Sequence, residues 1–222
     1  MARWNVGRFL ETLSFFRAVP LVGSLPWLAA PTAAAPILPG PPSGAAEVTV
    51  INFATATSAE RQLWGSLDDV VMGGVSRSGL SWIAEGARFS GEVSTANSGG
   101  FASVRSRNLE PPLNLNGYQG LRLHLRGDGN RYKFFLRDSS GWDSLAYAQG
   151  FDTVAGQEMT VDLPFDRFQP VFRARIVEGP PLNQSSIRSL QVMLSKFEFD
   201  RQLNPRFSAG PFQLDLIRLT AY

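Results

Sequence analysis

The sequence predicts an all-β protein, an antiparallel sandwich preceded by a short helix and a proline-rich linker. From residue 47 onward, apolar and polar residues alternate over short segments, and turn-forming residues separate these segments. The 222-residue chain contains 21 glycines and 15 prolines, which favour many turns and short strands over long helices. Alternation with one apolar face and frequent turns is typical of two packed antiparallel sheets.

Residues 1–20 are expected to form a short amphipathic helix. Apolar side chains recur at helical spacing until Pro20 ends the pattern: Val6, Phe9, Leu10, Leu13 and Phe16. Basic and aromatic residues in such a helix are typical of a segment that lies in a membrane interface. The membrane-surface candidates are Trp4, Phe9, Leu10, Leu13 and Phe16. A helix that docks on its own domain is the open alternative.

Residues 21–46 are apolar but repeatedly interrupted by proline, and we interpret them as a semi-extended linker. A membrane-spanning helix needs about 20 uninterrupted apolar residues, and prolines remove hydrogen bonds that lipid cannot replace. A cleaved secretory signal or a transit peptide also stays open, because arginines precede the apolar run and small residues occupy positions 33–35.

The domain at residues 47–222 contains nine segments with the pattern of strands. They are residues 48–53, 80–86, 87–95, 101–106, 120–129, 131–138, 158–164, 190–199 and 212–222. Alternation is strictest where Leu121, Leu123 and Leu125 interleave with charged residues and His124. Brief helical turns are expected near 164–168 and 183–190.

Composition excludes several functional classes. Residues 1–45 hold three arginines and one glutamate, so the rest of the chain has 18 basic and 18 acidic residues and no basic excess. A nucleic-acid partner is therefore not expected. Cysteine is absent, which removes disulfides, thiolate metal sites and a cysteine nucleophile. His124 is the only histidine, so a zinc site or a Ser-His-Asp triad would depend on that one imidazole. No catalytic residue, metal or cofactor is expected.

The motif WGSLDDVVMGGVS at residues 64–76 places Asp68 and Asp69 ahead of Met72 and the pair Gly73–Gly74. A glycosidase needs two carboxylates that converge across one bond, whereas neighbours in an extended segment point to opposite faces. The stretch also lacks the alternating oxygen ligands of a calcium loop. We therefore interpret the acids as backbone-shaping residues that accept hydrogen bonds while the chain turns.

Three further groups complete the candidate residues. Gly99 and Gly100 suit positive φ or close backbone approach, and Asp128 suits a hairpin turn between two glycines. The candidates for contact with another protein are Arg105, Trp142, Phe168, Phe172, Arg173 and Arg175. Aromatic residues and arginine dominate protein interfaces. The alternatives are that Trp142 covers a sandwich edge and that the phenylalanines close one end of the barrel.

Several motifs in order resemble the complex I intermediate-associated protein family across residues 53–222. They are WGSLDDVVMGGVS, FSGEVSTANSGGFASVRS, YQGLRLHLRGDGNRYKFFL, FDT, LPFDRFQPVFRAR and GPFQLDLIRLTAY. The resemblance implies a galactose-binding-like jelly roll. The segment GRFLETLSFF resembles leaders of the cyanobacterial or plastid branch of this family. The chain departs from the family pattern at Ala174, where glycine is expected, which concerns local loop geometry.

The resemblance implies a non-enzymatic assembly or stabilising factor for a membrane-bound electron-transfer complex, either of the complex I type or a photosystem. Its partners would be subunits or assembly intermediates of that complex. Its place would be peripheral on a thylakoid or another energy-converting membrane. The alternative is a carbohydrate-binding module, which would need an exposed aromatic platform. The aromatic candidates for such a platform are Trp82, Tyr132, Trp142 and Tyr147.

Overall fold

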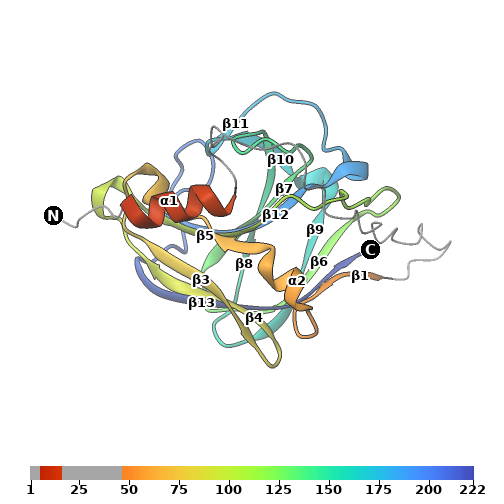
Figure 1. Ribbon diagram of the computed structural model, residues 1–222, viewed down its shortest axis with the longest axis horizontal. Coiled ribbons are helices and arrows are strands. Elements are labelled where there is room, and N and C mark those ends of the chain that lie inside the picture. Colours follow the sequence, from red (N-terminus) through yellow and green to blue (C-terminus); the bar gives the residue numbers. More distant parts are fainter. Residues whose placement is uncertain (1–5, 17–46) are drawn as a thin grey trace, which may run out of the picture.

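The computed structural model describes residues 6–16 and 47–222, and two antiparallel sheets face each other in it (Figure 1). The six-stranded sheet has the order β3-β4-β13-β6-β9, with β1 also paired to β13. The seven-stranded sheet has the order β11-β10-β8-β7-β12-β5-β2. This confirms the predicted all-β sandwich. Trp4 and the proline-rich linker lie outside the described residues.

The strands of the six-stranded sheet are β1 (Val48–Asn52), β3 (Arg77–Ile83), β4 (Gly86–Val93), β6 (Gly120–Arg126), β9 (Glu158–Pro164) and β13 (Gly210–Ala221). Those of the seven-stranded sheet are β2 (Trp64–Ser66), β5 (Phe101–Ser106), β7 (Arg131–Arg137), β8 (Ala146–Asp152), β10 (Gln169–Phe172), β11 (Arg175–Ile176) and β12 (Ser189–Ser195). All nine predicted strands are present. The sequence patterns missed β2, β8, β10 and β11.

Two α-helices and four 3-10 turns complete the described residues. They are α1 (Val6–Phe15), α2 (Ser58–Gln62), η1 (Asp69–Met72), η2 (Ala96–Ser98), η3 (Phe165–Arg167) and η4 (Gln184–Ser186). The turns η3 and η4 fall where brief helical turns were predicted. The unpredicted α2 begins with a capping box, in which the Thr57 side chain and the Glu60 side chain satisfy each other's backbone N–H groups.

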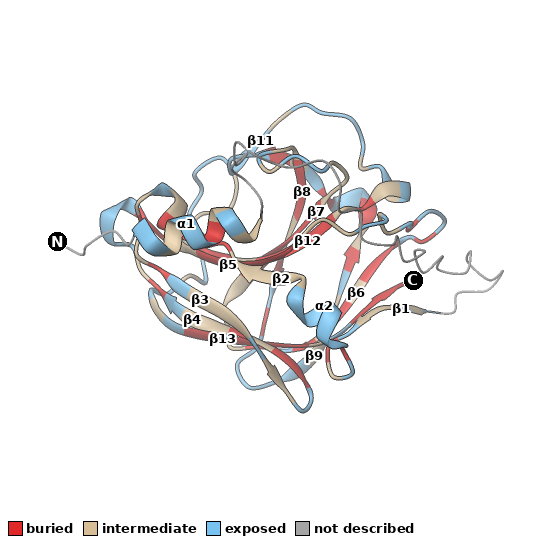
Figure 2. Ribbon diagram, viewed as in Figure 1, coloured by how far each residue is buried: buried red, intermediate tan, exposed pale blue. Residues whose placement is uncertain are grey.

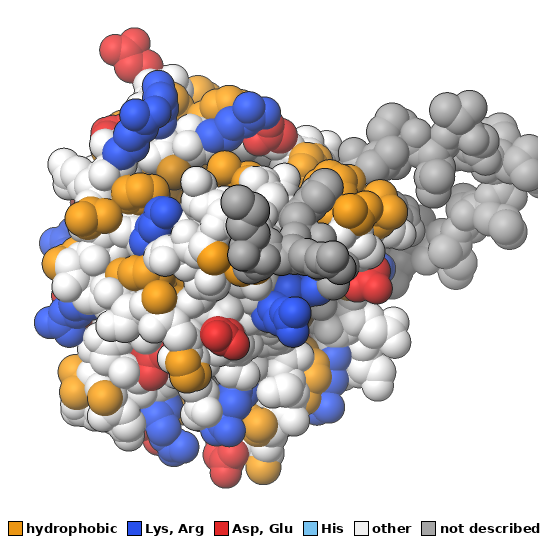
Figure 3. All heavy atoms as spheres, turned by 90° about the vertical axis from the view of Figure 1, so that its left-hand side faces the viewer, with side chains coloured by type: hydrophobic (Ala, Val, Ile, Leu, Met, Phe, Trp, Pro, Cys, Tyr) orange, Lys and Arg blue, Asp and Glu red, His pale blue; other side chains and the backbone are white. Residues whose placement is uncertain are grey.

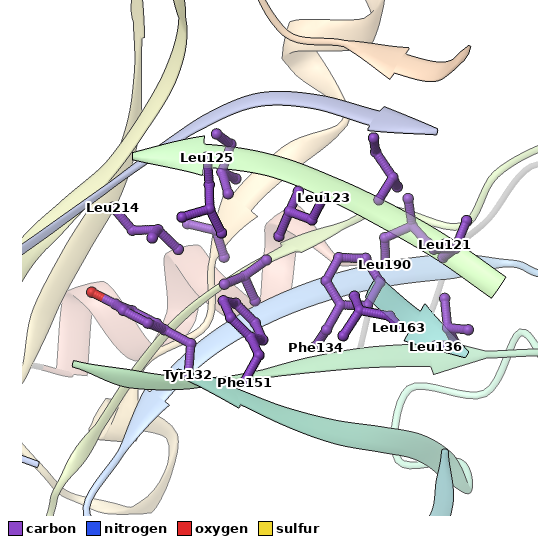
Figure 4. Packing of buried hydrophobic residues seen from close by; sticks show 14 of the residues in the cluster. Leu121, Leu123, Leu125, Tyr132, Phe134, Leu136, Phe151, Leu163, Leu190 and Leu214 are labelled. Carbon is purple, nitrogen blue, oxygen red and sulfur yellow. The ribbon is translucent and has the colours of Figure 1, made fainter. Parts of the chain in front are cut away.

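The main core lies between the two sheets, where the buried residues concentrate (Figure 2). Leu121, Leu123 and Leu125 of β6 point toward Tyr132 and Phe134 of β7 (Figure 4). Alternate residues of a strand point to opposite faces, so the other side chains of β6 and β7 face outward. His124 is one of them and lies half-buried beside Thr160, away from the core.

The long strand β13 keeps its inward residues only because its register shifts once. Its pairing with β6 contains a bulge between Leu216 and Arg218. Phe212, Leu214 and Leu216 are buried before the bulge, and Leu219 and Ala221 are buried after it. One inserted residue therefore returns the apolar side chains to the core face, as a β-bulge does.

Ala174, where the chain departs from the family pattern, lies in the tight hairpin between β10 and β11. Phe172 pairs with Arg175, so Arg173 and Ala174 form a two-residue loop with φ values of 48° and 64°. Such loops favour glycine, because left-handed backbone brings Cβ close to the following carbonyl oxygen at a cost of about 1–2 kcal/mol. The carbonyl oxygen of Ala174 accepts a hydrogen bond from the Asp200 N–H, which helps to hold the loop.

We predict that Ala174→Gly stabilises the protein by about 0.5 kcal/mol, because relief of the left-handed strain outweighs the added flexibility of the unfolded chain. Ala155→Gly is the matched control, since Ala155 is exposed in a turn and is not in the left-handed region. That control should lower stability by about 0.5 kcal/mol. Urea denaturation measures both, and effects of the same sign would contradict the prediction.

Candidate functional site: a cleft on the seven-stranded sheet

A cleft of about 710 Å³ lies on the outer face of the seven-stranded sheet. Outward residues of β5, β7 and β12 line its floor, among them Arg105, Phe135 and Met193. Its walls come from α1, η1, the loop before β8 and the β10–β11 hairpin. This volume is in the usual range of ligand pockets, so the cleft is the main candidate site among the described residues.

Asp69 occupies a cradle of backbone donors at one wall of this cleft. Its carboxylate accepts hydrogen bonds from the N–H groups of Ser76 at 2.9 Å and Gly100 at 2.7 Å, and from the Ser76 hydroxyl at 2.6 Å. Gly74 and Gly99 leave room for it, because a Cβ at either position would lie within 2.4 Å of the carboxylate. Gly73 has a different role, since its φ of 89° ends η1 in left-handed backbone.

Asp68 joins the two sheets. Its carboxylate accepts hydrogen bonds from the Ser78 N–H on β3 at 2.9 Å and from the Ser103 N–H on β5 at 3.1 Å. Burial raises the pKa of the Asp68 carboxyl, while these hydrogen bonds and the charge of Arg8 act in the opposite direction. The oxygens of Asp68 and Asp69 are occupied by donors from the protein itself, as expected of backbone-shaping residues.

The other residues that were predicted to shape the backbone have different environments. Asp128 is a turn residue as expected: it accepts hydrogen bonds from the Asn130 N–H at 3.0 Å and the Tyr132 hydroxyl at 2.8 Å. Gly100 lies against Lys196, whose Cδ would be 2.4 Å from an added Cβ. Met72 was assigned to the backbone-shaping motif, but its side chain is 78% exposed at the rim of the cleft. It is therefore a surface residue.

The helix α1 docks on the sandwich, which is the alternative that the sequence left open for it. Arg8 donates hydrogen bonds to Asp68 and to the Ser76 carbonyl oxygen, both at 2.9 Å. Phe15 packs on Gly65, where a Cβ would lie 2.4 Å from the ring. The Arg107 side chain donates to the Phe15 carbonyl oxygen at 3.0 Å.

The five membrane-surface candidates therefore have different environments. Phe9 and Leu13 line the cleft, and Phe16 packs against Trp142 with ring centroids 5.2 Å apart. Leu10 is 56% exposed and points away from the domain. Trp4 lies outside the described residues. Neither described helix is long and apolar enough to cross a bilayer.

Arg105 was expected on an exposed contact surface, but it is buried at the cleft floor with 3% of its surface exposed. Its guanidinium lies 5.7 Å from the ring centre of Phe16 and 5.4 Å from that of Trp142. It donates one hydrogen bond, at 3.1 Å, to the Trp142 carbonyl oxygen. Trp142 thus covers the arginine on the outer face of the sheet, close to the alternative in which it acts as a cover over the sandwich.

Sequence reasoning missed three more cations of the cleft lining, which are Lys133, Arg137 and Lys196. Arg137 donates to the Gln191 side chain at 2.9 Å, and the Lys133 ammonium donates to the Glu198 carbonyl oxygen at 2.9 Å. Burial lowers the pKa of Lys133 to about 8. The sequence did contain one indication of a covered site. Phe135 lies between Lys133 and Arg137 on the otherwise polar face of β7, and an apolar residue there indicates that this face is also covered.

The predicted patch of phenylalanine and arginine around Pro170 divides between core and surface. Phe168 is only 7% exposed and belongs to the core, so it closes the end of the barrel and is not a surface contact. Phe172 is 39% exposed, and Arg173 and Arg175 are exposed as well. Arg173 forms an ion pair with Asp143 across the mouth of the cleft.

The aromatic platform required by the carbohydrate alternative does not form. Tyr132 and Tyr147 are at most 1% exposed in the core. Trp82 lies in β3 of the six-stranded sheet and packs against Phe53, which follows β1 of the same sheet. Trp142 is the one of these four that reaches the cleft, and it rests on Phe16. Within residues 6–16 and 47–222, no group of three or more histidine or acidic residues could hold a metal ion.

Comparison with known proteins identifies the family. The profile of the family described as Complex I intermediate-associated protein 30 (CIA30) matches residues 51–216. The chain belongs to this family. An uncharacterised protein of Schizosaccharomyces pombe is 29% identical over 165 residues, which cover 67% of this chain and 75% of the yeast protein. Membership indicates a role related to complex I assembly.

Solved structures confirm the jelly-roll architecture of this CIA30 family member. A family 11 carbohydrate-binding module of Clostridium thermocellum, in complex with a mixed-linked tetrasaccharide, has a TM-score of 0.54 and 14% identity. The match covers 81% of this chain and 96% of the module. The same module type from the cellulase Lic26A-Cel5E has a TM-score of 0.55 and 15% identity, with 81% and 97% covered. At such identity the likeness concerns the fold alone.

We predict that Asp69→Ala lowers the free energy of unfolding by about 3 kcal/mol or more, because several buried donors lose their acceptor. Asp69→Asn should lose less, since one amide oxygen can still accept. Asp166→Ala is the control, because Asp166 is exposed, and it should change stability by less than about 0.5 kcal/mol. Urea denaturation that gives Asp69→Ala the stability of the control would contradict the assigned role.

We predict that Arg8→Ala loosens α1 from the sandwich without unfolding it. The loss of two hydrogen bonds should raise amide hydrogen exchange in residues 6–16 about tenfold, the factor that corresponds to about 1.4 kcal/mol. Glu11→Ala, on the exposed side of α1, is the control. Hydrogen exchange read by mass spectrometry measures both variants, and unchanged protection in Arg8→Ala would show that other contacts hold the helix.

Proposed function

We propose that this protein is a non-enzymatic assembly factor that binds an intermediate of a complex I-type electron-transfer complex through the cleft face of its seven-stranded sheet. Family membership supports a role in complex I assembly, and the residues of the cleft support binding to another protein. Arginine, phenylalanine and tryptophan meet there, and these residue types carry most of the binding energy in protein interfaces.

The rim of the cleft supports contact with a polypeptide. Met72 lines the cleft and is 78% exposed. Phe172 and Ile176, with exposed fractions of 39% and 44%, belong to the β10–β11 hairpin, whose loop residues Arg173 and Ala174 form one wall. Large exposed apolar side chains close to one another are typical of interaction surfaces. On the face drawn in Figure 3, basic, acidic and hydrophobic side chains are interspersed without a block of one charge, which favours a protein over a nucleic acid.

The absence of catalysis is part of the proposal. The two adjacent carboxylates accept hydrogen bonds from backbone N–H groups and serines, so they are structural acceptors in place of a general acid and base. Binding without reaction is also what an assembly factor requires, because it must release its client unchanged.

We place the protein at the surface of the energy-converting membrane in which the complex is built, held there by its client. The contacts of Phe9, Leu13 and Phe16 with the domain leave α1 with only part of an apolar face for lipid. A thylakoid membrane with a photosystem as the client is the alternative.

The deciding experiment is affinity purification of the tagged full chain from gently solubilised membranes of cells that contain it, followed by mass spectrometry. We expect complex I-type subunits in particles smaller than the finished complex. Met72→Glu at the rim should reduce their recovery about tenfold, because Met72 lines the cleft with 78% of its surface exposed and a charge placed there would lie in the interface. Val154→Glu is the control, because Val154 is 49% exposed and does not line the cleft.

Three results would contradict or redirect the proposal. Recovery of photosystem subunits would select the alternative client. Recovery of only the finished complex would indicate a stable subunit in place of an assembly factor. An equal loss in both variants would show that the cleft rim is not the contact surface.

A further inference from the structure

Two arginines in the cleft have no acidic partner: Arg105 is buried, and Arg137 is half-buried with a buried Nε atom. All 19 acidic residues of the chain lie within residues 6–16 and 47–222, which the structure describes. Residues 1–5 and 17–46 therefore contain no aspartate or glutamate. None of those 19 forms an ion pair with Arg105 or Arg137. Burying a charge is costly unless it is paired, so this arrangement calls for an anion from elsewhere.

The two guanidinium groups also keep hydrogen-bonding capacity. A guanidinium has five N–H donors. Arg105 donates to the Trp142 carbonyl oxygen and Arg137 donates to the Gln191 side chain. The Nε atoms of both arginines are buried and have no hydrogen-bond partner. Buried donors of this kind are rare in native structures and need an explanation.

Strand register brings these two arginines to one place. Gln191 of β12 pairs with Arg105 on β5, and Ser189 of β12 pairs with Arg137 on β7. Both side chains therefore project from the same face of the sheet, on either side of β12. Burial lowers the pKa of Arg105 to about 10. Burial together with the charge of Arg105 lowers the pKa of Arg137 to about 9, against a smaller opposing effect of Asp143.

The other charges of the cleft do not neutralise them. Asp69 is held by backbone donors, and Asp143 is paired with Arg173. Lys133 and Lys196 add two more cations to the lining. The cleft therefore has a positive potential, which low-dielectric walls strengthen.

The rest of the floor is apolar. Phe135, Ala146 and Val171 form a small buried cluster against which Met193 and Phe199 pack. These residues line the same cleft as the two arginines. A ligand that fits must therefore carry an anionic group next to an apolar one.

We propose that this cleft binds a carboxylate attached to an apolar group, with the acid held by Arg105 and Arg137 and the apolar group on Phe135 and Met193. A planar carboxylate matches the fork of a guanidinium, and its single charge costs less to bury than a phosphate dianion. The occupant is an acidic side chain of the client, next to an apolar residue. This identity rests on the proposed function, whereas the anion site stands on its own geometry.

The site is tested first with small probes on the purified full chain. The probe is 4-phenylbutanoate, and its uncharged amide, 4-phenylbutanamide, carries the same apolar group. We expect about 10 mM of the acid to raise the melting temperature by about 3 °C. Calorimetric titration should give a dissociation constant at least about tenfold lower for the acid than for the amide. Equal binding of the two probes, or tighter binding of inorganic phosphate, would overturn the proposal.

Variants locate the acid group. Arg105→Met and Arg137→Met keep the apolar stem of each side chain, and each should weaken binding of the acid about tenfold or more. Neither should lower the melting temperature of the free protein, because each removes a charge without an acidic partner. Arg77→Met, at an exposed position outside the cleft, should bind the acid as the unaltered protein does. Should a cleft variant fail to fold, the comparison of acid and amide in the unaltered protein still decides.

The source of the carboxylate is tested by affinity purification of the same variants. Arg105→Met and Arg137→Met should lose the client, while Arg77→Met should retain it. If the cleft variants retain the client while the unaltered protein binds the acid probe, the client is not the source of the carboxylate. If the unaltered protein recovers no complex I-type subunits, the proposed function fails, and the probe titrations still decide whether the cleft is a carboxylate site.

Discussion

The structure depends on a pair of buried carboxylates at the open edge of the sandwich. Asp68 accepts hydrogen bonds from β3 of one sheet and β5 of the other, and Asp69 ties the start of β5 to the turn before β3. Core packing holds the sheets face to face, but it does not fix how their edges meet. A charged acceptor that receives several backbone N–H groups does fix it, because each such bond is directional and is stronger in a buried setting.

The strands that could be predicted from the sequence are those with one face in the core, and the strands that were missed lack a clear alternation. Strict alternation, as at Leu121–Leu125, predicted the strands because each has one face in the core. The strand β8 was missed because its sequence AYAQGFD includes Gly150 and has small residues on its outer face, so its alternation is weak. The short strands β2, β10 and β11 have too few residues to show a period.

The candidate site was harder to predict than the fold, because its residues combine only through pairings that are distant in sequence. Arg105 was selected as a surface contact, and nothing in its neighbourhood in sequence shows that Phe16 and Trp142 will cover it. Arg137 appeared as one charge in a strand of alternating polarity. Whether Arg137 has an acidic partner depends on the side chains that β5, β7 and β12 bring together, and these strands are distant in sequence. The role of Asp68 and Asp69 was predictable, because adjacent acids followed by glycines have few other uses in a turn.

Stability and recognition are coupled at this site because the same carboxylates serve both. The Asp68 carboxylate accepts a hydrogen bond from Arg8 and so holds α1 in place. Phe16, which directly follows α1, lies over Arg105. A change in the acidic pair would therefore reach the cleft through the helix. At the proposed anion site the two arginines work in the opposite direction, since a charge without an acidic partner in the cleft is costly and an anionic ligand would compensate it. A sandwich fixed at its edge by Asp68 and Asp69 can tolerate that cost.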